Sequence, residues 1–287
     1  MLASVMIDGQ LVPPERAQVS VFDRGFLYGD SVFEALRTHD GRLALLGEHL
    51  ARLERSAARV FIPLPVPVAA LREEVEATVL AQGSAESYVR VVLTRGVASA
   101  LGLDPELAEA PCRVVIVTPL KLPPAEIYEQ GIGAITFRIE RPSDALSAAS
   151  AKIGNYLASV LAMKRARAEG ASEALLEDAH GNILEGSTSN VFAALRGTLV
   201  TPPETAAILP GITRARVLEA AREANMPVEL RSISREELAQ ADEICITSSI
   251  REVVPVVKLD GRAVGSGSPG PFARELLRRF RQLVRRG

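Results

Sequence analysis

Lys152 and Glu185 are the two side chains of this sequence around which reactive chemistry can be built. Lys152 follows a run of small residues, SAASA, and is expected to open an amphipathic helix. Its amine can add to an aldehyde, and once released it can act as a general base. Glu185 ends an expected hairpin that turns at 179–182, and its carboxylate can keep a ring nitrogen protonated. Each residue alone is more often an ordinary surface group.

A helix that opens with the letters PGIT, at 210–213, offers a place for an anion. The first amides of a helix have no partner within it and lie at the positive end of its dipole, so those of Ile212 and Thr213 can bind a phosphate. Thr213 alone would equally support an ordinary helix cap.

Further phosphate donors come from other parts of the chain. Arg52, on an expected helix over 47–60, presents a guanidinium fork; a surface pairing with Glu48, four residues earlier, is the simpler explanation of that residue alone. Ser248 and Ser249 follow Thr247 at the end of the strand EICIT and add hydroxyl groups. An amine, a ring-nitrogen partner and several phosphate donors together match the requirements of pyridoxal 5'-phosphate.

The composition is that of a globular protein with a small-molecule ligand. The chain has 287 residues, 47% of them hydrophobic and 24% charged, which suits two domains. Its net charge of -2 and pI of about 6.1 argue against nucleic acid or an anionic membrane as a partner, and no stretch reaches transmembrane length. Cys112 and Cys245 lie in apolar runs, which indicates buried thiols in a reducing cytoplasm and no metal site.

The hydrophobic pattern predicts an α+β fold in two domains. Strands surround helices over 47–60 and 68–81 in the first part, with a hairpin turn at 39–42. A proline pair in KLPPAEIYEQ marks a joint. We therefore expect a small N-terminal α+β domain at 1–120, a linker at 121–130, and a larger, β-rich C-terminal domain at 131–287 that carries Lys152.

The motifs occur in an order that resembles the class IV aminotransferases, the pyridoxal phosphate enzymes of fold type IV. The resemblance covers nearly the whole chain and rests on VFDRGFLYGDSVFEALR, GEHLARLERSA, SYVRVVLTRGVASALGLDP, KIGNYLASVLA, EALLEDAHGNILEGSTSNVF, LPGITRARVLEAA and ADEICITSSIREVVPV. It implies a covalent, catalytic role for Lys152 and a pyridine partner in Glu185. The further cofactor residues that it implies are Arg52, Ile212, Thr213, Ser248 and Ser249 for the phosphate and Tyr156 for the phenolic oxygen.

The resemblance also suggests a substrate pocket and an assembly. Tyr88 and Arg90 are similar to the Tyr-x-Arg element of branched-chain enzymes, in which the arginine meets a substrate carboxylate. Tyr28 and Phe33 resemble aromatic pocket residues that reach the partner subunit's site, which implies a homodimer with sites near the subunit interface.

The function that we expect is transfer of an amino group between a hydrophobic, branched-chain L-amino acid and 2-oxoglutarate. The residues after Thr94-Arg95-Gly96 lack the arginine and histidine of bacillary D-amino acid enzymes. An aminodeoxychorismate lyase, which releases pyruvate and 4-aminobenzoate, and a D-amino acid or (R)-amine transaminase remain alternatives. A relative without enzymatic activity that serves as a structural dimer is the competing class.

Overall fold

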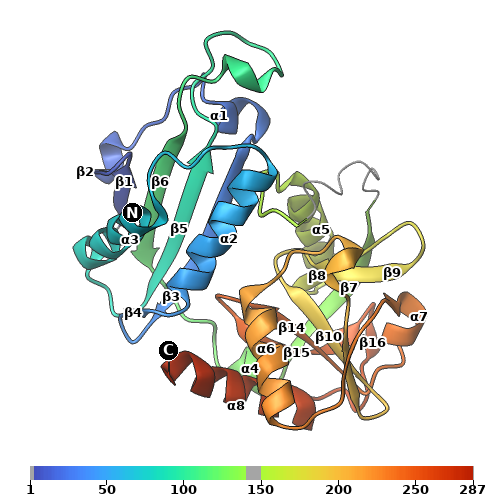
Figure 1. Cartoon of the computed structure of the whole chain (residues 1–287). Helices are drawn as coiled ribbons and strands as arrows, with labels where there is room; N and C mark the ends of the chain where they lie inside the picture. Colours follow the sequence, from blue (N-terminus) through green and yellow to red (C-terminus); the bar gives the residue numbers. More distant parts are fainter. Residues whose placement is uncertain (1–2, 140–149, 287) are drawn as a thin grey trace. The chain divides into compact units, whose positions relative to one another are not determined.

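The computed structural model describes residues 3–139 and 150–286. Its chain forms two compact units, one of Met1–Leu122 with Ala151–Asn155 and one of Pro123–Ser150 with Tyr156–Gly287. Each unit mixes helices with a sheet of its own, so the α+β class is confirmed (Figure 1). The break at Leu122 falls inside the expected linker at 121–130.

The first unit is an antiparallel sheet with two long helices. Its strands, in spatial order, are β2 (Gln10–Val12), β1 (Ser4–Ile7), β6 (Cys112–Pro119), β5 (Ser87–Thr94), β3 (Ser31–His39) and β4 (Arg42–Leu43). Its helices are α1 (Arg24–Tyr28), α2 (Leu46–Arg59) and α3 (Val68–Gln82), with 3₁₀ turns at Pro14–Arg16 and Pro105–Leu107. The two predicted helices and the predicted hairpin are therefore confirmed.

The core of this unit lies between the sheet and helices α2 and α3. Leu50 and Leu53 of α2 pack against Leu36 of β3 and Val91 of β5. Spacings of three and four residues place the apolar side chains on one face of a helix, while alternation separates the two faces of a strand. Arg90 consequently lies on the sheet face opposite to the helices, beside its cross-strand partner Ala35.

The segment around Lys152 belongs to the first unit. Ile153 forms an antiparallel bridge with Val32, and the N–H of Phe33 donates to the carbonyl of Lys152 at 2.9 Å. The N–H of Lys152 donates to Oγ of Ser56 on α2 at 3.1 Å. The expectation that Lys152 opens a helix is wrong, because these bonds hold it in a short extended segment and the helix starts only at Leu157. Lys152 also groups with the first unit, whereas we expected it in the C-terminal domain at 131–287.

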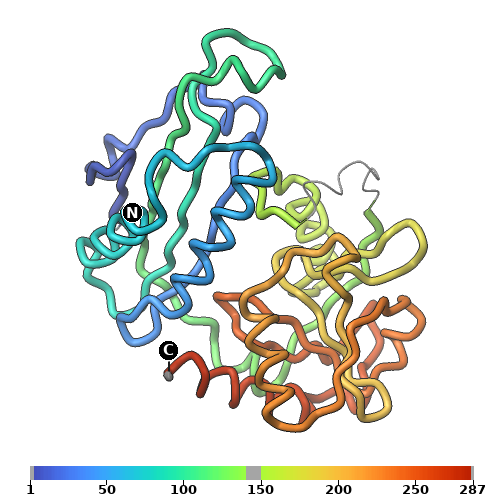
Figure 2. The backbone as a smooth tube through the Cα atoms, in the orientation of Figure 1, coloured from blue at the N-terminus to red at the C-terminus, as the bar shows by residue number. Residues whose placement is uncertain are grey.

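The second unit is built on a larger mixed sheet. Its strands, in spatial order, are β12 (Val228–Leu230), β11 (Thr198–Thr201), β10 (Asn190–Leu195), β14 (Glu243–Ser248), β15 (Glu252–Leu259), β7 (Ile132–Arg138), β8 (Glu173–Glu177), β9 (Asn182–Gly186) and β13 (Ile233–Ser234), with β16 (Arg262–Ala263) beside β15. Its helices are α4 (Glu126–Glu129), α5 (Leu157–Ala168), α6 (Ile212–Glu223), α7 (Arg235–Leu238) and α8 (Pro271–Arg286), with a 3₁₀ turn at Glu204–Ala206. The course of the backbone through both units can be followed in Figure 2.

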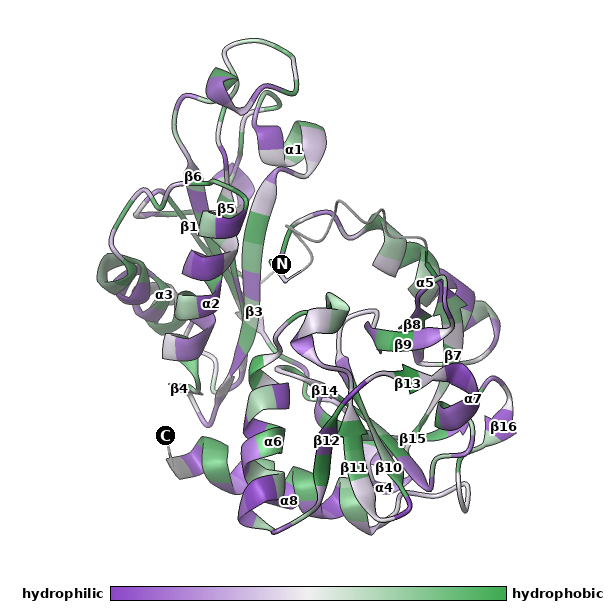
Figure 3. Cartoon of the chain, turned by 45° about the vertical axis from the view of Figure 1, so that its right-hand side comes forward, coloured by the Kyte–Doolittle hydropathy of each residue, from purple (hydrophilic) through white to green (hydrophobic). Residues whose placement is uncertain are grey.

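Apolar strands form the centre of this unit, and amphipathic helices cover them. Val191, Ile246 and Val254 of neighbouring strands are buried in one cluster. Helix α8 carries hydrophobic and hydrophilic residues in alternating bands (Figure 3) and buries Leu276 and Phe280. Within 3–139 and 150–286, no helix combines the length and the apolarity needed to span a bilayer.

Candidate active site

Three of the expected residues lie together in the first unit. The ring of buried Phe33 has Nζ of Lys152 4.6 Å from its centroid and the guanidinium carbon of Arg90 4.0 Å from it. An aromatic face attracts cations, so the ring holds both side chains near it. The site thus places a nucleophilic amine, a fixed cation and an apolar surface within one small region. Tyr88 follows the same alternation on β5 as Arg90.

Arg52 is held by a carboxylate that sequence reasoning missed. Nε and Nη2 of Arg52 donate to the two oxygens of Glu34, each at 2.7 Å. His49, one turn before Arg52 on α2, donates from Nδ1 to Glu34 at 2.7 Å. Burial opposes ionisation of Glu34, but the charge and hydrogen bonds of Arg52, together with His49, lower the pKa of Glu34 to about 2.

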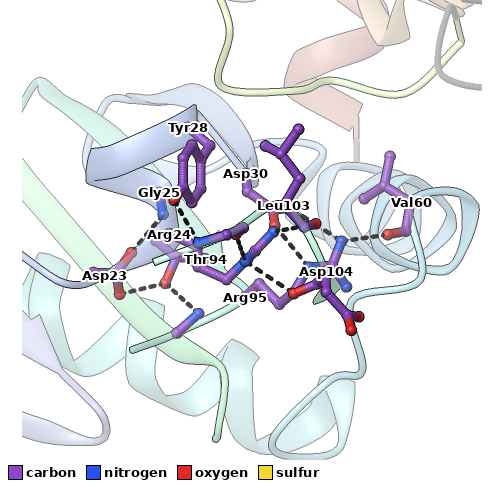
Figure 4. A network of polar contacts seen from close by, with 12 residues as sticks. Asp23, Arg24, Gly25, Tyr28, Asp30, Val60, Thr94, Arg95, Leu103 and Asp104 are labelled. Carbon is purple, nitrogen blue, oxygen red and sulfur yellow. Dashed lines mark hydrogen bonds and ion pairs between the residues drawn. The ribbon is translucent and has the colours of Figure 1, made fainter. Parts of the chain in front are cut away.

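Tyr28 belongs to a network that anchors a loop. Its hydroxyl accepts a hydrogen bond from the N–H of Gly102 at 3.1 Å, and the guanidinium of Arg24 lies 5.1 Å from its ring centroid (Figure 4). Asp30 pairs with Arg24 at 2.9 Å and with Arg95 at 2.7 Å. Tyr28 is therefore tied to the segment around Gly102, and none of its described contacts tests a role in a substrate pocket.

In the second unit, Glu185 lies on β9 as the hairpin pattern predicts. Its Oε2 accepts a hydrogen bond from the N–H of Leu209 at 3.0 Å, and its side chain is half-buried. Leu209 lies two residues before Gly211, the residue that caps the N-terminus of α6. The structure thus brings together the carboxylate and the helix N-terminus that the sequence assigned to two ends of one cofactor.

The N-terminus of α6 has the form of a tight cradle. Its cap, Gly211, has no side chain that could accept a hydrogen bond from the first amides, and both Ile212 and Thr213 are buried. Nδ2 of Asn190 donates to the carbonyl of Leu209 at 2.9 Å, and a Cβ on residue 211 would collide with Oδ1 of the same amide. A side chain at position 211 would therefore displace Asn190. Because glycine cannot cap the helix, the amides of Ile212 and Thr213 can donate to an anion.

A buried hydroxyl lies beside this cradle. Thr247 is the direct cross-strand partner of Asn190, and its Oγ1 has no hydrogen-bond partner among the described residues. Such a group costs free energy unless a ligand or water satisfies it. Ser248 and Ser249 follow at the end of β14, with Oγ of Ser248 accepting from the N–H of Arg251 at 3.3 Å. Helix amides, hydroxyls and an orphaned donor fit the phosphate of pyridoxal phosphate.

Buried Glu173 joins the loop after β9 to the turn after β14, and sequence reasoning missed it. It accepts hydrogen bonds from the hydroxyls of Ser187 and Ser189, in the loop that follows Glu185, and from Arg251, in the turn that follows Ser249. The acidic residue in the apolar strand EALLE was the signal, because a buried carboxylate requires donors.

Tyr156 is half-buried and precedes α5.

The comparisons with known proteins decide the family. Residues 31–259 match the family model of amino-transferase class IV. The chain belongs to the class IV aminotransferases. It is 38% identical to a Methanocaldococcus jannaschii protein provisionally named a branched-chain-amino-acid aminotransferase. The alignment covers 97% of this chain and 96% of that protein. It is 33% identical to the D-alanine aminotransferase of Bacillus licheniformis, in an alignment that covers 95% of this chain and 94% of that protein.

A solved structure gives the same result for the fold and the cofactor. The branched-chain amino acid aminotransferase of T.th., complexed with N-(5'-phosphopyridoxyl)-L-glutamate, superposes with a TM-score of 0.90 at 31% identity, covering 98% of this chain and 93% of that one. This class IV aminotransferase is accordingly a pyridoxal phosphate-dependent enzyme of fold type IV, as the sequence predicted.

Proposed function

We propose that this aminotransferase moves an amino group between a hydrophobic, branched-chain L-amino acid and 2-oxoglutarate. The observation that carries the proposal is the cluster of Arg90, Phe33 and Lys152. Arg90 offers a fixed cation for the second carboxylate of a dicarboxylic acid, and Phe33 offers an apolar face for a hydrophobic side chain. The branched-chain names of two similar proteins and the glutamate adduct in one of them support the same substrates.

The cofactor is proposed to be held by the residues that the motifs single out. Pyridoxal phosphate supplies an aldehyde for amino-group exchange and a ring that takes up negative charge from the substrate's α-carbon. We assign its binding to Arg52, Lys152, Tyr156, Glu185, Ile212, Thr213, Ser248 and Ser249. The cradle at Gly211 and the orphaned Oγ1 of Thr247 support the phosphate part of this assignment.

The two residues assigned to the reaction would have different tasks. Nζ of Lys152 would hold the cofactor through its aldehyde and, once freed by the substrate amine, would serve as the base that moves the α-proton. The carboxylate of Glu185 keeps the ring nitrogen protonated, so that the ring accepts electrons. The N–H of Leu209 fixes the direction of that carboxylate. Tyr28 and Tyr88 are proposed to line the substrate pocket with Phe33.

A second copy of the chain is proposed to cover an apolar surface on the first unit. Phe26 on α1 and Leu103 in the loop tied to Tyr28 are 69% and 79% exposed, and Phe22 and Leu101, close to them in the sequence, are also exposed. Apolar surface of this kind marks association sites. We expect sedimentation to give a dimer, and Leu103→Asp to weaken it. We also propose a cytoplasmic location, in keeping with the two free thiols.

The test is the spectral conversion of the bound cofactor to its pyridoxamine form by a panel of amino acids and amines. L-Leucine, L-isoleucine, L-valine and L-glutamate should each convert it, and 2-oxoglutarate should reverse the change. Conversion by D-alanine or an (R)-amine alone would overturn the proposal in favour of the second candidate, which the similarity to a D-alanine aminotransferase supports. Pyruvate and 4-aminobenzoate formed from aminodeoxychorismate would identify a lyase.

The role of Lys152 has a matched test. Lys152→Ala should abolish turnover and leave the fold intact, because its backbone bonds to Phe33 and Ser56 do not involve the side chain. Lys164→Ala, on an exposed position of α5, should retain full activity. Transamination by Lys152→Ala at near the wild-type rate would refute the assignment, and a wild-type protein that binds no cofactor would favour the structural-dimer alternative.

A further inference from the structure

We propose that Glu34 is a positioning residue that aims the guanidinium of Arg52 at the cofactor's phosphate and so makes the protein selective for phosphorylated over unphosphorylated pyridoxal. The inference rests on the proposed function, in which Arg52 binds that phosphate. Glu34 itself touches neither cofactor nor substrate in this proposal. It acts through Arg52.

The geometry of the pair fixes the guanidinium in one plane. Nε and Nη2 of Arg52 donate side by side to Oε1 and Oε2 of Glu34, both at 2.7 Å. Two parallel bonds of this kind hold an arginine more rigidly than one bond does. His49 fixes the carboxylate in turn, with Nδ1 at 2.7 Å from Oε2. The exposed fractions of Glu34, His49 and Arg52 are 0%, 1% and 4%, so water does not compete for these bonds.

The same two elements also hold the lysine that binds the aldehyde. Glu34 follows Phe33 on β3, whose N–H binds the carbonyl of Lys152. Arg52 lies one turn before Ser56 on α2, whose Oγ accepts from the N–H of Lys152. The pair of Glu34 and Arg52 therefore joins β3 to α2 next to the anchor of Lys152. The residue assigned to the phosphate and the residue assigned to the aldehyde are thus supported by the same strand and the same helix.

Glu34 could act on Arg52 by neutralising its charge or by orienting its guanidinium. The two roles predict opposite effects of removing Glu34 on phosphate binding. An arginine neutralised by a carboxylate attracts an anion less than an isolated arginine does. If Glu34 were only a counter-charge, its removal would therefore tighten phosphate binding. If it orients Arg52, its removal weakens phosphate binding although the local charge becomes more positive. The sign of the change separates the two roles.

The experiment compares two ligands on the apoprotein, pyridoxal 5'-phosphate and pyridoxal, with dissociation constants measured by isothermal titration calorimetry. Glu34→Gln is expected to weaken the binding of pyridoxal 5'-phosphate by roughly 30-fold and that of pyridoxal by less than about threefold, because only the phosphate of the former contacts Arg52 in this proposal. Arg52→Ala should show the same pattern. Melting temperatures of each apoprotein, without ligand, report the structural cost separately.

Glu74→Gln is the matched control. In the same unit, Glu74 on α3 accepts from Arg113 on β6, with Nε at 2.9 Å and Nη2 at 2.8 Å, in the same paired arrangement. Arg113 is assigned no role in the site. Loss of this pair should lower the melting temperature and leave the affinity ratio of the two ligands unchanged.

Three results would overturn the proposal: an unchanged ratio in Glu34→Gln, tighter binding of pyridoxal 5'-phosphate, or equal weakening of both ligands. Should Glu34→Gln fail to fold, Glu34→Asp decides, because it keeps the charge and withdraws the carboxylate by one methylene. That variant is expected to lower the affinity for pyridoxal 5'-phosphate relative to that for pyridoxal. An unchanged relative affinity would refute the role of Glu34 in orienting Arg52. A wild-type protein that binds neither ligand would instead refute the proposed function.

Discussion

The amine of Lys152 lies 4.6 Å from the ring centroid of Phe33, while the carbonyl of the same lysine accepts a hydrogen bond from the N–H of the same phenylalanine at 2.9 Å. One residue of β3 therefore holds the lysine at both its backbone and its side chain. Because β3 is paired along its length with β5, this support is rigid. The position of the amine is set by the sheet, and helix α5 begins only afterwards.

Replacing Phe33 should affect catalysis more than folding. Phe33→Leu keeps an apolar side chain and removes the aromatic face that attracts the cations of Lys152 and Arg90. We expect about a tenfold loss of kcat, together with a higher KM for 2-oxoglutarate, on the scale of roughly 1.4 kcal/mol. Steady-state kinetics on both substrates will measure this. Val92→Leu, at the cross-strand partner of Phe33, is the control and should retain the wild-type kcat.

Glu185 offers a substitution that separates charge from structure. In Glu185→Gln the side-chain oxygen can still accept the hydrogen bond from the N–H of Leu209, so the fold should be retained. The charge that keeps the ring nitrogen protonated is lost, and we expect kcat to fall by at least about 100-fold. Single-turnover absorbance of the bound cofactor will measure the chemical step. Activity close to wild type would show that another group protonates the ring.

Gly211 should tolerate no side chain. In Gly211→Ala the new Cβ collides with the side-chain amide of Asn190, which is held by the carbonyl of Leu209. Either Asn190 or the start of α6 must move, and we expect a loss of roughly 2 kcal/mol in stability with weaker binding of pyridoxal 5'-phosphate. Chemical denaturation and ligand titration will measure the two effects. Gly133→Ala, whose Cβ would meet its nearest neighbour at 3.8 Å, is the matched control.

The features predicted from sequence are those with local causes. Helix α2 is recognisable because Leu50, Leu53 and Ala57 recur at helical spacing, and the hairpin before Glu185 follows from its turn residues. The placement of Lys152 depends on the bridge between Ile153 and Val32, which are far apart in sequence, so local patterns predict a helix there instead.

Buried charges were the other gap in the sequence prediction. Glu34 interrupts an apolar strand, and His49 and Arg52 share the apolar face of α2 with Leu50 and Leu53. Each of these residues alone breaks the pattern of its element. Their meaning depends on mutual contact across the fold, because the burial of one charge is stabilised by another. Motif resemblance identified Arg52 and gave no indication of its partner.

His49 should make the first unit sensitive to mild acid. Burial lowers the pKa of His49 below its usual value, and the charges of Arg52 and Lys152 act in the same direction, against the hydrogen bond to Glu34. The unfolded chain, with a histidine pKa near 6.5, then binds a proton that the folded protein resists. Stability is therefore complete above about pH 6.5 and falls as the pH drops towards the folded pKa, by at most roughly 1.4 kcal/mol per pH unit.

Chemical denaturation of the apoprotein at pH 7.5, 6.5 and 5.5 will measure this slope. His49→Gln, which can still donate a hydrogen bond to Glu34, should flatten it between pH 6.5 and 5.5. Glu34 contributes no slope in that window, because a carboxylate whose pKa is lowered to about 2 stabilises the fold above about pH 4.5 and loses that effect only as the pH falls towards 2. His180→Gln, at an exposed hairpin turn, is the control. A slope that survives unchanged in His49→Gln would show that a group other than His49 produces it.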